Sequence, residues 1–268
     1  MDAQTSFADD KLLVAIRADL VGLLTINRPQ KKNALNDAMW RAIPQALAWL
    51  ADQNQARVIV IKGAGERDFC AGADVGEFET LRKDATTARL YEAGNSAAFT
   101  AIRNCSVPVI AAIRGICFGG GFGLAAAADI RMADDSARFA IPAARLGLAY
   151  PLDAVPDLVR ALGDQAARHA LYSAQELSAR EAKALGCLMK LCSPEQLDAE
   201  VDALAGTIAR AAPLSVRASK AAIAAHGGGS AQDLSTAARL ADVTFESRDY
   251  AEGRTAFMQK RTARFSGE

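Results

Sequence analysis

Residues 107–129 of the chain, VPVIAAIRGICFGGGFGLAAAAD, decide how it folds. An apolar run typical of a strand (107–113) leads into a glycine-rich segment (115–123), and an alanine-rich run that favours a helix (124–129) follows. Parallel strands are joined by long crossover connections, usually helices, so a strand that passes directly into a helix is typical of parallel α/β folds. The stretch therefore predicts an α/β protein with a parallel sheet.

The same alternation of strands and helices continues on both sides of this stretch. Asn36 or Asp37 is the expected N-cap of a helix that runs to about residue 52, and a polar helical region is expected over 75–103. We expect only helices from Pro156 onward, with a boundary near residue 195 between an α/β core (1–195) and a helical C-terminal region (196–268). Further strands are expected at 11–17, 20–26, 57–62, 130–133 and 137–141.

Composition and charge argue against several classes of protein. A chain of 268 residues, 51% hydrophobic and 23% charged, can bury a core without disulfides or a structural metal. Its 31 basic and 31 acidic residues balance, which argues against a nucleic-acid-binding face. The five cysteines form no Cys-x-x-Cys pair, so we expect reduced thiols and no metal site. The first residues lack the apolar core of a signal peptide, and no apolar stretch is long enough for a membrane span, so we expect a cytoplasmic protein.

A second glycine-containing turn, FCAGADV (69–75), also lies where a strand passes into a helix. Glycine lets a ligand approach the backbone, and the first N–H groups of a helix have no partner within the helix. Such a turn favours a negative oxygen, either a phosphate or a developing oxyanion, although tight packing of strand against helix explains a single turn equally well. The glycines at 119–121 match neither the P-loop pattern nor the dinucleotide-binding pattern.

Five segments follow one another along nearly the whole chain: NRPQKKNAL (27–35), FCAGADV (69–75), PVIAAIRGICFGGG (108–121), ADIRMADDSARFAIPAARLG (128–147) and EGRTAFMQKR (252–261). Together they resemble the crotonase superfamily, the group of enoyl-CoA hydratases and isomerases. This resemblance implies a crotonase-like spiral of β-β-α units with a helical C-terminal region that forms a homotrimer or a dimer of trimers. It also implies an acyl-CoA substrate, with coenzyme A as part of the thioester and no tightly bound cofactor.

The resemblance also implies the roles of individual residues. The backbone N–H groups of Ala73 and Gly120 would form an oxyanion hole for the thioester oxygen. The C-terminal motif would reach the CoA nucleotide, often that of a neighbouring subunit. Lys31, Lys32 and Lys260 could instead be ordinary charged residues of the solvated surface. The residues expected along CoA are Lys31, Lys32, Ala34, Ala71, Gly72, Asp74, Phe257 and Lys260.

The chain departs from the family at the two positions where hydratases carry catalytic glutamates. The pattern puts these glutamates at Gly123, two residues after the third glycine, and at Ala143, directly after the proline of FAIPA. Neither residue can transfer a proton, and general acid–base catalysis contributes roughly 10²–10⁴-fold. We therefore expect hydration by the usual route to be nearly abolished, while the electrostatic site at the two turns remains.

Two residues of the segment LGLAYPLD (146–153) are candidates for the missing chemistry. Tyr150 has a Leu-Gly-x-x-Tyr context similar to that of the superfamily's decarboxylases of malonyl-type thioesters, which carry a histidine where this chain has Ala73. Tyr150 could donate a proton to an enolate or simply line the acyl pocket. Asp153 could act as a base or nucleophile, or could cap the next helix. Three functions follow: a hydratase/isomerase-type enzyme with altered proton groups, a decarboxylase, or a catalytically silent thioester-binding protein.

Overall fold

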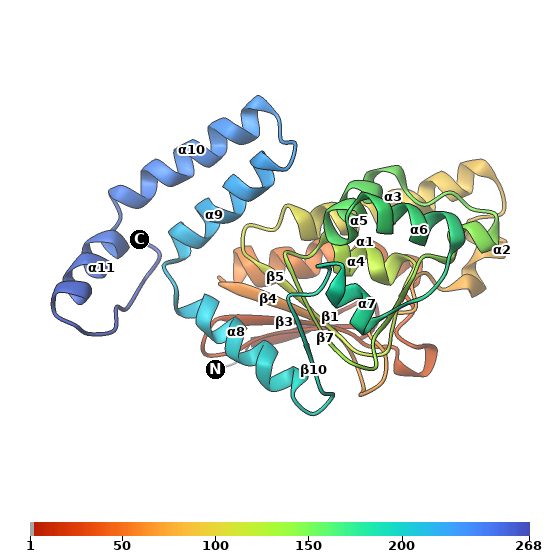
Figure 1. Cartoon of the computed structure of the whole chain (residues 1–268), viewed down its shortest axis with the longest axis horizontal. Coiled ribbons are helices and arrows are strands. Elements are labelled where there is room, and N and C mark those ends of the chain that lie inside the picture. Colours follow the sequence, from red (N-terminus) through yellow and green to blue (C-terminus); the bar gives the residue numbers. More distant parts are fainter. Residues whose placement is uncertain (1–2) are drawn as a thin grey trace.

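The computed structural model describes residues 3–268 of the chain and confirms the expected α/β class (Figure 1). A seven-stranded sheet has the order β1-β2-β3-β4-β5-β7-β10 and is parallel from β3 onward. A second sheet has the order β6-β8-β9. The strands are β1 Ala3–Phe7, β2 Leu12–Ile16, β3 Val21–Ile26, β4 Val58–Gly63, β5 Val109–Ile113, β6 Ile116–Phe118, β7 Ile130–Asp134, β8 Arg138–Ala140, β9 Leu177–Ser178 and β10 Lys190–Cys192.

The expectation of helices alone after Pro156 is wrong, because β9 and β10 both lie in that part of the chain. β10 adds a parallel edge strand beside β7, and β9 pairs antiparallel with β8. These strands are only two or three residues long. Segments this short carry no readable periodicity, and their pairing with distant strands determines their conformation.

The helices expected from Asn36 or Asp37 and over 75–103 begin close to where the sequence predicts, whereas α4 begins at Gly120, inside the expected glycine-rich segment. Asn36 is the N-cap of α1, and its side-chain oxygen accepts a hydrogen bond from the Met39 N–H at 3.0 Å. The polar region 75–103 is divided into a 3₁₀ turn (Val75–Glu77), α2 and α3, and Asp84 caps α3. The helices are α1 Asp37–Ala48, α2 Phe78–Leu81, α3 Ala85–Arg103, α4 Gly120–Ala127, α5 Val155–Leu162, α6 Asp164–Ser173, α7 Ala179–Ala184, α8 Leu197–Arg210, α9 Pro213–His226, α10 Ala231–Phe245 and α11 Arg248–Met258.

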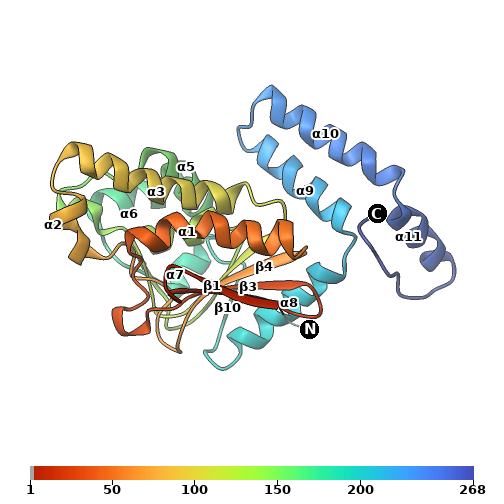
Figure 2. The ribbon, with the colours of Figure 1, turned by 180° about the vertical axis from the view of Figure 1, so that it is seen from behind.

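Helices cover both faces of the large sheet (Figures 1 and 2). Successive residues of a strand point to opposite faces, so Ile59 and Ile61 of β4 join the core beneath α1, α3 and α4. Val58 and Val60 face the other way, toward α8. This layering fixes the strand-to-helix turns at one end of the sheet.

The C-terminal helices divide into two groups. Helix α8 lies beyond the expected boundary at residue 195 but packs on the sheet through Leu197, Val201 and Ala205. Helices α9–α11 extend away from the sheet in both views (Figures 1 and 2). An ion pair between Lys220 of α9 and Asp129, at 2.8 Å, ties the start of this arm to the core. Within the described part of the chain, no helix has the length and apolar character that crossing a bilayer requires.

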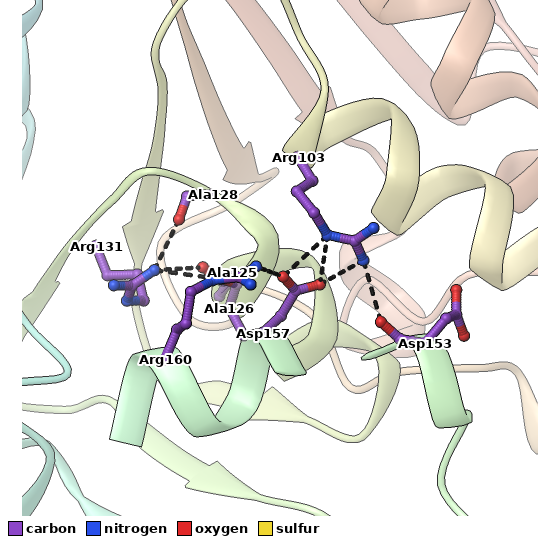
Figure 3. Close-up of polar contacts among 8 residues, drawn as sticks. All are labelled: Arg103, Ala125, Ala126, Ala128, Arg131, Asp153, Asp157 and Arg160. Carbon is purple, nitrogen blue, oxygen red and sulfur yellow. Dashed lines mark hydrogen bonds and ion pairs between the residues drawn. The ribbon is translucent and has the colours of Figure 1, made fainter. Parts of the chain in front are cut away.

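One arginine network joins α3 to α5, and a second arginine holds the C-terminal end of α4 (Figure 3). Arg103 of α3 donates to the buried Asp157 of α5 through Nε at 3.0 Å and Nη2 at 2.6 Å, and Arg160 contacts the same carboxylate. Arg131 donates to the main-chain oxygen of Ala128 at 2.7 Å, at the C-terminal end of α4. Because carbonyl groups at a helix end lack partners within the helix, this arginine stabilises the C-terminus of α4.

Candidate active site

The two glycine-containing turns lie side by side because short backbone pairing joins their strands. The N–H of Cys70 donates to the oxygen of Ile116, and the N–H of Phe118 donates to the oxygen of Cys70, both at 2.9 Å. The FCAGADV turn and the GGGFG turn thus converge at the start of α4. The structure therefore brings together two segments that are about fifty residues apart in the sequence.

Each turn presents one backbone N–H group, that of Ala73 or Gly120, and the two turns lie in close contact. Gly72 and Gly119, which precede Ala73 and Gly120, have φ values of +94° and +51°, a region that L-residues rarely adopt. A Cβ atom built on Gly72 would lie 3.2 Å from the nitrogen of Gly120, so the turns are in close contact. Within residues 3–268, the N–H groups of Ala73 and Gly120 donate to no protein acceptor. The arrangement has the donors that an oxyanion needs.

The indole ring of Trp40 in α1 borders this pair of donors. A Cβ atom on Gly120 would lie 2.8 Å from Cζ2 and Cη2 of Trp40, and 3.9 Å from the nitrogen of Ala73. Trp40 is fully buried and makes an edge-to-face contact with Phe99 of α3, with ring centroids 5.6 Å apart. Any larger side chain at Gly120 would collide with this ring.

Tyr150 occupies the space beside Gly123, one of the two positions where hydratases carry a glutamate. A Cβ atom on Gly123 would lie 2.6 Å from the Tyr150 hydroxyl oxygen and 2.7 Å from Cζ of Phe99. The hydroxyl donates to the oxygen of Gly119 at 3.5 Å, a long hydrogen bond. Burial raises the pKa of Tyr150, and the negative charge of Asp157 raises it further, so the phenol is protonated at neutral pH.

The crowding at Gly123 predicts a loss of stability when this glycine becomes alanine. Alanine normally favours a helix over glycine, but here its methyl group must displace Tyr150 or Phe99. We expect Gly123→Ala to lower the free energy of unfolding by about 1–3 kcal/mol, as overpacked cores do. Gly206→Ala in α8 is the matched control, because its methyl group meets only the flexible end of Arg210. Equal effects of the two changes in urea unfolding would contradict this account.

Asp153 lies exposed at the surface. Its carboxylate accepts a hydrogen bond from the Ser96 hydroxyl at 2.9 Å, and its main-chain oxygen accepts one from Arg103 (Figure 3). The N-cap interpretation of Asp153 is wrong: the 3₁₀ turn begins at Leu152 after Pro151, and α5 begins after Ala154. The negative charge of Asp153 contributes to the raised pKa of Tyr150.

The cysteines beside the turns are buried thiols. Cys70 and Cys117 face each other in a short parallel bridge and are free rather than disulfide-bonded. Burial raises the pKa of the Cys70 thiol to about 12 and that of Cys117 well above its usual range. A thiolate is the reactive form, so these residues are suited to filling the core rather than to nucleophilic attack. Within residues 3–268, no cluster of histidine, cysteine or acidic side chains could hold a metal ion.

Six of the residues expected along CoA lie in the segment 27–35 and in the first turn, and hydrogen bonds join these two segments. The N–H of Ala71 donates to the oxygen of Lys32 at 2.9 Å, and Arg28 bridges the oxygen of Ala34 and the carboxylate of Asp74. Burial of Asp74 opposes ionisation, but the hydrogen bonds from Arg28 and from a backbone N–H outweigh it and lower the pKa of Asp74. Lys31 and Lys32 are exposed beside this network.

Two expected CoA contacts are not brought to this loop within one chain. Phe257 lies at the end of α11 and Lys260 just after it, on the part of the arm far from the sheet (Figures 1 and 2). Phe257 is 83% exposed. Their expected position near CoA therefore stays a prediction that requires a neighbouring subunit.

A cavity of about 650 Å³ lies elsewhere, at the C-terminal ends of β3, β4 and β5 and beside the start of α8. Its lining includes Lys62, Arg114 and Asp198, but not the two N–H donors or Tyr150. Arg114 already pairs with Asp134 and Asp198 there. The candidate site is defined by the paired turns rather than by this cavity.

Sequence reasoning missed three buried polar residues: Trp40 of α1, which borders the turns, and Tyr91 and Asn95 of α3. All are buried, with exposed fractions of 0%, 2% and 5%. Each has a buried polar atom without a hydrogen-bond partner among the described residues: Trp40 Nε1, Tyr91 Oη and Asn95 Oδ1. The only signal in the sequence was that polar residues occupy positions on the apolar faces of α1 and α3. Ordinary packing in a core explains such residues equally well, so they did not indicate a site.

Known proteins resemble this chain over nearly its full length. The sequence profile of the enoyl-CoA hydratase/isomerase family matches residues 17–268. A crotonyl-CoA hydratase of Syntrophomonas wolfei is 35% identical over 257 residues, covering 94% of this chain and 97% of the relative. A mevalonyl-coenzyme A hydratase of Aspergillus fumigatus is 36% identical over 205 residues, covering 76% of this chain and 75% of the relative.

Solved structures agree with these sequence matches. An enoyl-CoA hydratase/carnithine racemase from Magnetospirillum magneticum has a TM-score of 0.91 and 34% identity, covering 99% of this chain and 97% of its own. A putative enoyl-CoA hydratase/isomerase family protein from Hyphomonas neptunium has a TM-score of 0.90 and 36% identity, covering 96% and 98%. The chain therefore has the crotonase fold and belongs to the enoyl-CoA hydratase/isomerase family.

Proposed function

We propose that this protein is an acyl-CoA-processing enzyme that holds the thioester oxygen between the N–H groups of Ala73 and Gly120. The observation that carries the proposal is that both N–H groups lie free at the junction of the two turns. Withdrawal of electrons toward this oxygen stabilises an enolate at the neighbouring α carbon. Removing one such donor typically costs roughly 10²–10³-fold in rate, so the pair alone is a substantial catalytic device.

The proton chemistry of the proposed enzyme centres on Tyr150. A phenol with a raised pKa can donate a proton at neutral pH but is a poor base. Gly123 and Ala143 supply no proton-transfer group of their own. The proposed enzyme thus stabilises an enolate as hydratases and isomerases of the family do. It differs from the hydratases in the groups that transfer protons.

Decarboxylation of a malonyl-type thioester is the second candidate, because it forms an enolate without a base. The bond between the α carbon and the carboxylate breaks, its electron pair enters the enolate, and carbon dioxide leaves. Tyr150 then gives its proton to the α carbon and regains one from solvent. The Tyr150 hydroxyl lies beside Gly119 and Gly123. Gly119 directly precedes Gly120, which carries one of the two N–H donors, so this position supports proton donation to the enolate.

The CoA moiety would lie along Lys31, Lys32, Ala34, Ala71, Gly72 and Asp74, with Phe257 and Lys260 supplied by a neighbouring subunit of a trimer or a dimer of trimers. The exposed lysines beside the Arg28–Asp74 pair support this placement, because CoA phosphates attract positive charge. CoA is then part of the substrate, and no other cofactor is required.

Turnover assays with purified protein test the proposed chemistry. With crotonyl-CoA, we expect the absorbance of the conjugated thioester to persist, because the usual acid and base are missing. Turnover at the rate of an ordinary hydratase would refute this reading of Gly123 and Ala143. With methylmalonyl-CoA, release of carbon dioxide that slows in Tyr150→Phe would support decarboxylation. No release, or unchanged release in the variant, would exclude it.

Carbonyl polarisation can be measured without turnover. A thioester labelled with ¹³C at its carbonyl should show a lower infrared stretching frequency when the two N–H groups hold its oxygen. Polarisation without turnover of any thioester tested would favour the third possibility, a catalytically silent thioester-binding protein. No binding of any acyl-CoA in calorimetry would remove the proposal as a whole.

A further inference from the structure

A fully buried asparagine joins the segment 27–35 to the loop that leads from β4 into the first turn. Asn33 is 0% exposed, and its side-chain oxygen accepts a hydrogen bond from the N–H of Arg28 at 3.0 Å. Its side-chain nitrogen donates to the main-chain oxygens of Ala64 at 3.0 Å and Asp68 at 2.7 Å. Both N–H bonds of the amide are used, which offsets the cost of burying a polar group. The amide therefore fixes the segment against the loop.

The same amide holds a turn of the backbone. Asn33 has a φ of +56° and follows Lys32 with a φ of +51°, a region that residues with side chains seldom adopt, although asparagine tolerates it. The N–H of Asn33 closes this turn by donating to the oxygen of Arg28 at 2.9 Å. Beyond the turn, Leu35 forms a parallel bridge with Ala73. Asn33 thus anchors the end of the segment that contacts the first N–H donor.

The bridge at Leu35 sets the direction of the Ala73 N–H. The N–H of Leu35 donates to the oxygen of Gly72, and the N–H of Asp74 donates to the oxygen of Leu35, both at 2.8 Å. The oxygen of Gly72 and the N–H of Ala73 belong to one peptide group, which is planar and trans, so they point in opposite directions. Because Leu35 holds that oxygen on one side, the N–H of Ala73 points to the other, where it meets no acceptor within residues 3–268.

Asn33 is also linked to the second turn, through Asp68. The main-chain oxygen of Asp68 accepts from Asn33, and its side-chain oxygen accepts a hydrogen bond from the N–H of Ile116 at 3.0 Å. Ile116 is the first residue of β6, the strand that leads into the turn containing Gly120. A shift of Asn33 would therefore move the two turns relative to each other.

We propose that Asn33 is a positioning residue of the oxyanion hole: its buried amide sets the direction of the Ala73 N–H and the separation of that N–H from the one of Gly120. Asn33 acts through the backbone and not by contact with the thioester. This role rests on the proposed thioester site at Ala73 and Gly120. Misplacing a catalytic group by about 1 Å can cost roughly 10²-fold in rate, so a group that fixes one N–H donor has a large effect on the site.

The infrared stretching frequency of a bound thioester carbonyl measures this role without turnover. The probe is butyryl-CoA labelled with ¹³C at its carbonyl, bound to the full chain at a concentration that calorimetry shows to be saturating. We expect the wild-type protein to lower the frequency, and Asn33→Gly to lose about half of this shift or more, because one of the two N–H donors then points away. Glycine adopts a positive φ readily, so the substitution removes the amide and keeps the backbone conformation accessible.

Asn54→Gly is the matched control, because it makes the same substitution at an asparagine whose amide also donates to a main-chain oxygen, that of Trp49 at 2.8 Å. Asn54 precedes β4 and the first turn follows it, so the control lies at the other end of this strand. It should retain the full shift. A frequency in Asn33→Gly equal to that of the wild type would overturn the positioning role and leave the thioester site intact. An unshifted carbonyl in the wild-type protein would instead refute the proposed function, and the positioning role with it.

Asp68→Ala decides the matter if Asn33→Gly does not fold. The Asp68 side chain is only partly buried, and its removal breaks the link to Ile116 while the amide of Asn33 stays in place. We expect part of the frequency shift to be lost in Asp68→Ala and none in Asn54→Gly. In that case, full retention of the shift in Asp68→Ala would overturn the proposal.

Discussion

Gly72→Ala is expected to abolish polarisation of a bound thioester carbonyl and to lower any turnover that needs both N–H donors by about 10²–10³-fold. Gly72 has a φ of +94°, and a Cβ atom there would lie 2.9 Å from the oxygen of Phe118 and 3.2 Å from the nitrogen of Gly120. The methyl group would separate the two turns and cover the second donor. The infrared frequency of a ¹³C-labelled thioester measures the loss directly.

Gly186→Ala is the matched control for this substitution. Gly186 has a φ of +80°, so alanine suffers a similar backbone strain, but its methyl group would meet no atom within 4 Å. The control should lose some stability and retain carbonyl polarisation. If both variants polarise the thioester like the wild type, the oxyanion hole does not lie between Ala73 and Gly120.

Asp157→Ala is expected to lower the free energy of unfolding by about 3 kcal/mol, because it leaves the cations of Arg103 and Arg160 without their shared anion. The Asp157 side chain is 1% exposed and accepts from both Nε and Nη2 of Arg103. The Arg103 side chain remains 28% exposed, and its residual hydration keeps the cost at the lower end for a buried pair. Urea unfolding at one fixed protein concentration measures this change.

Asp164→Ala provides the comparison for a surface ion pair. Asp164 pairs with Arg168 at 2.7 Å on α6, and both side chains are more than half exposed. Such pairs contribute little, so we expect hardly any change in stability. A loss for Asp157→Ala no larger than that for Asp164→Ala would show that the network of Figure 3 does not hold α3 and α5 together.

Much of the fold follows from local sequence patterns. Short apolar runs identify β2–β5 and β7, and Asn36 marks the beginning of α1, because these signals lie within a few neighbouring residues. The short strands β9 and β10 give no such signal, and α8 could be placed on the sheet only once its neighbours were known. Their conformation and packing depend on residues far away in the sequence.

The sequence by itself determines that the two glycine turns can expose free N–H groups and that Gly123 and Ala143 supply no proton-transfer group. Both are properties of residue type: glycine permits a positive φ, and glycine and alanine carry no titratable group. The tertiary structure alone decides what fills the space around those turns. Tyr150 stands against Gly123, and Trp40 against Gly120, because packing joins segments that no periodicity relates.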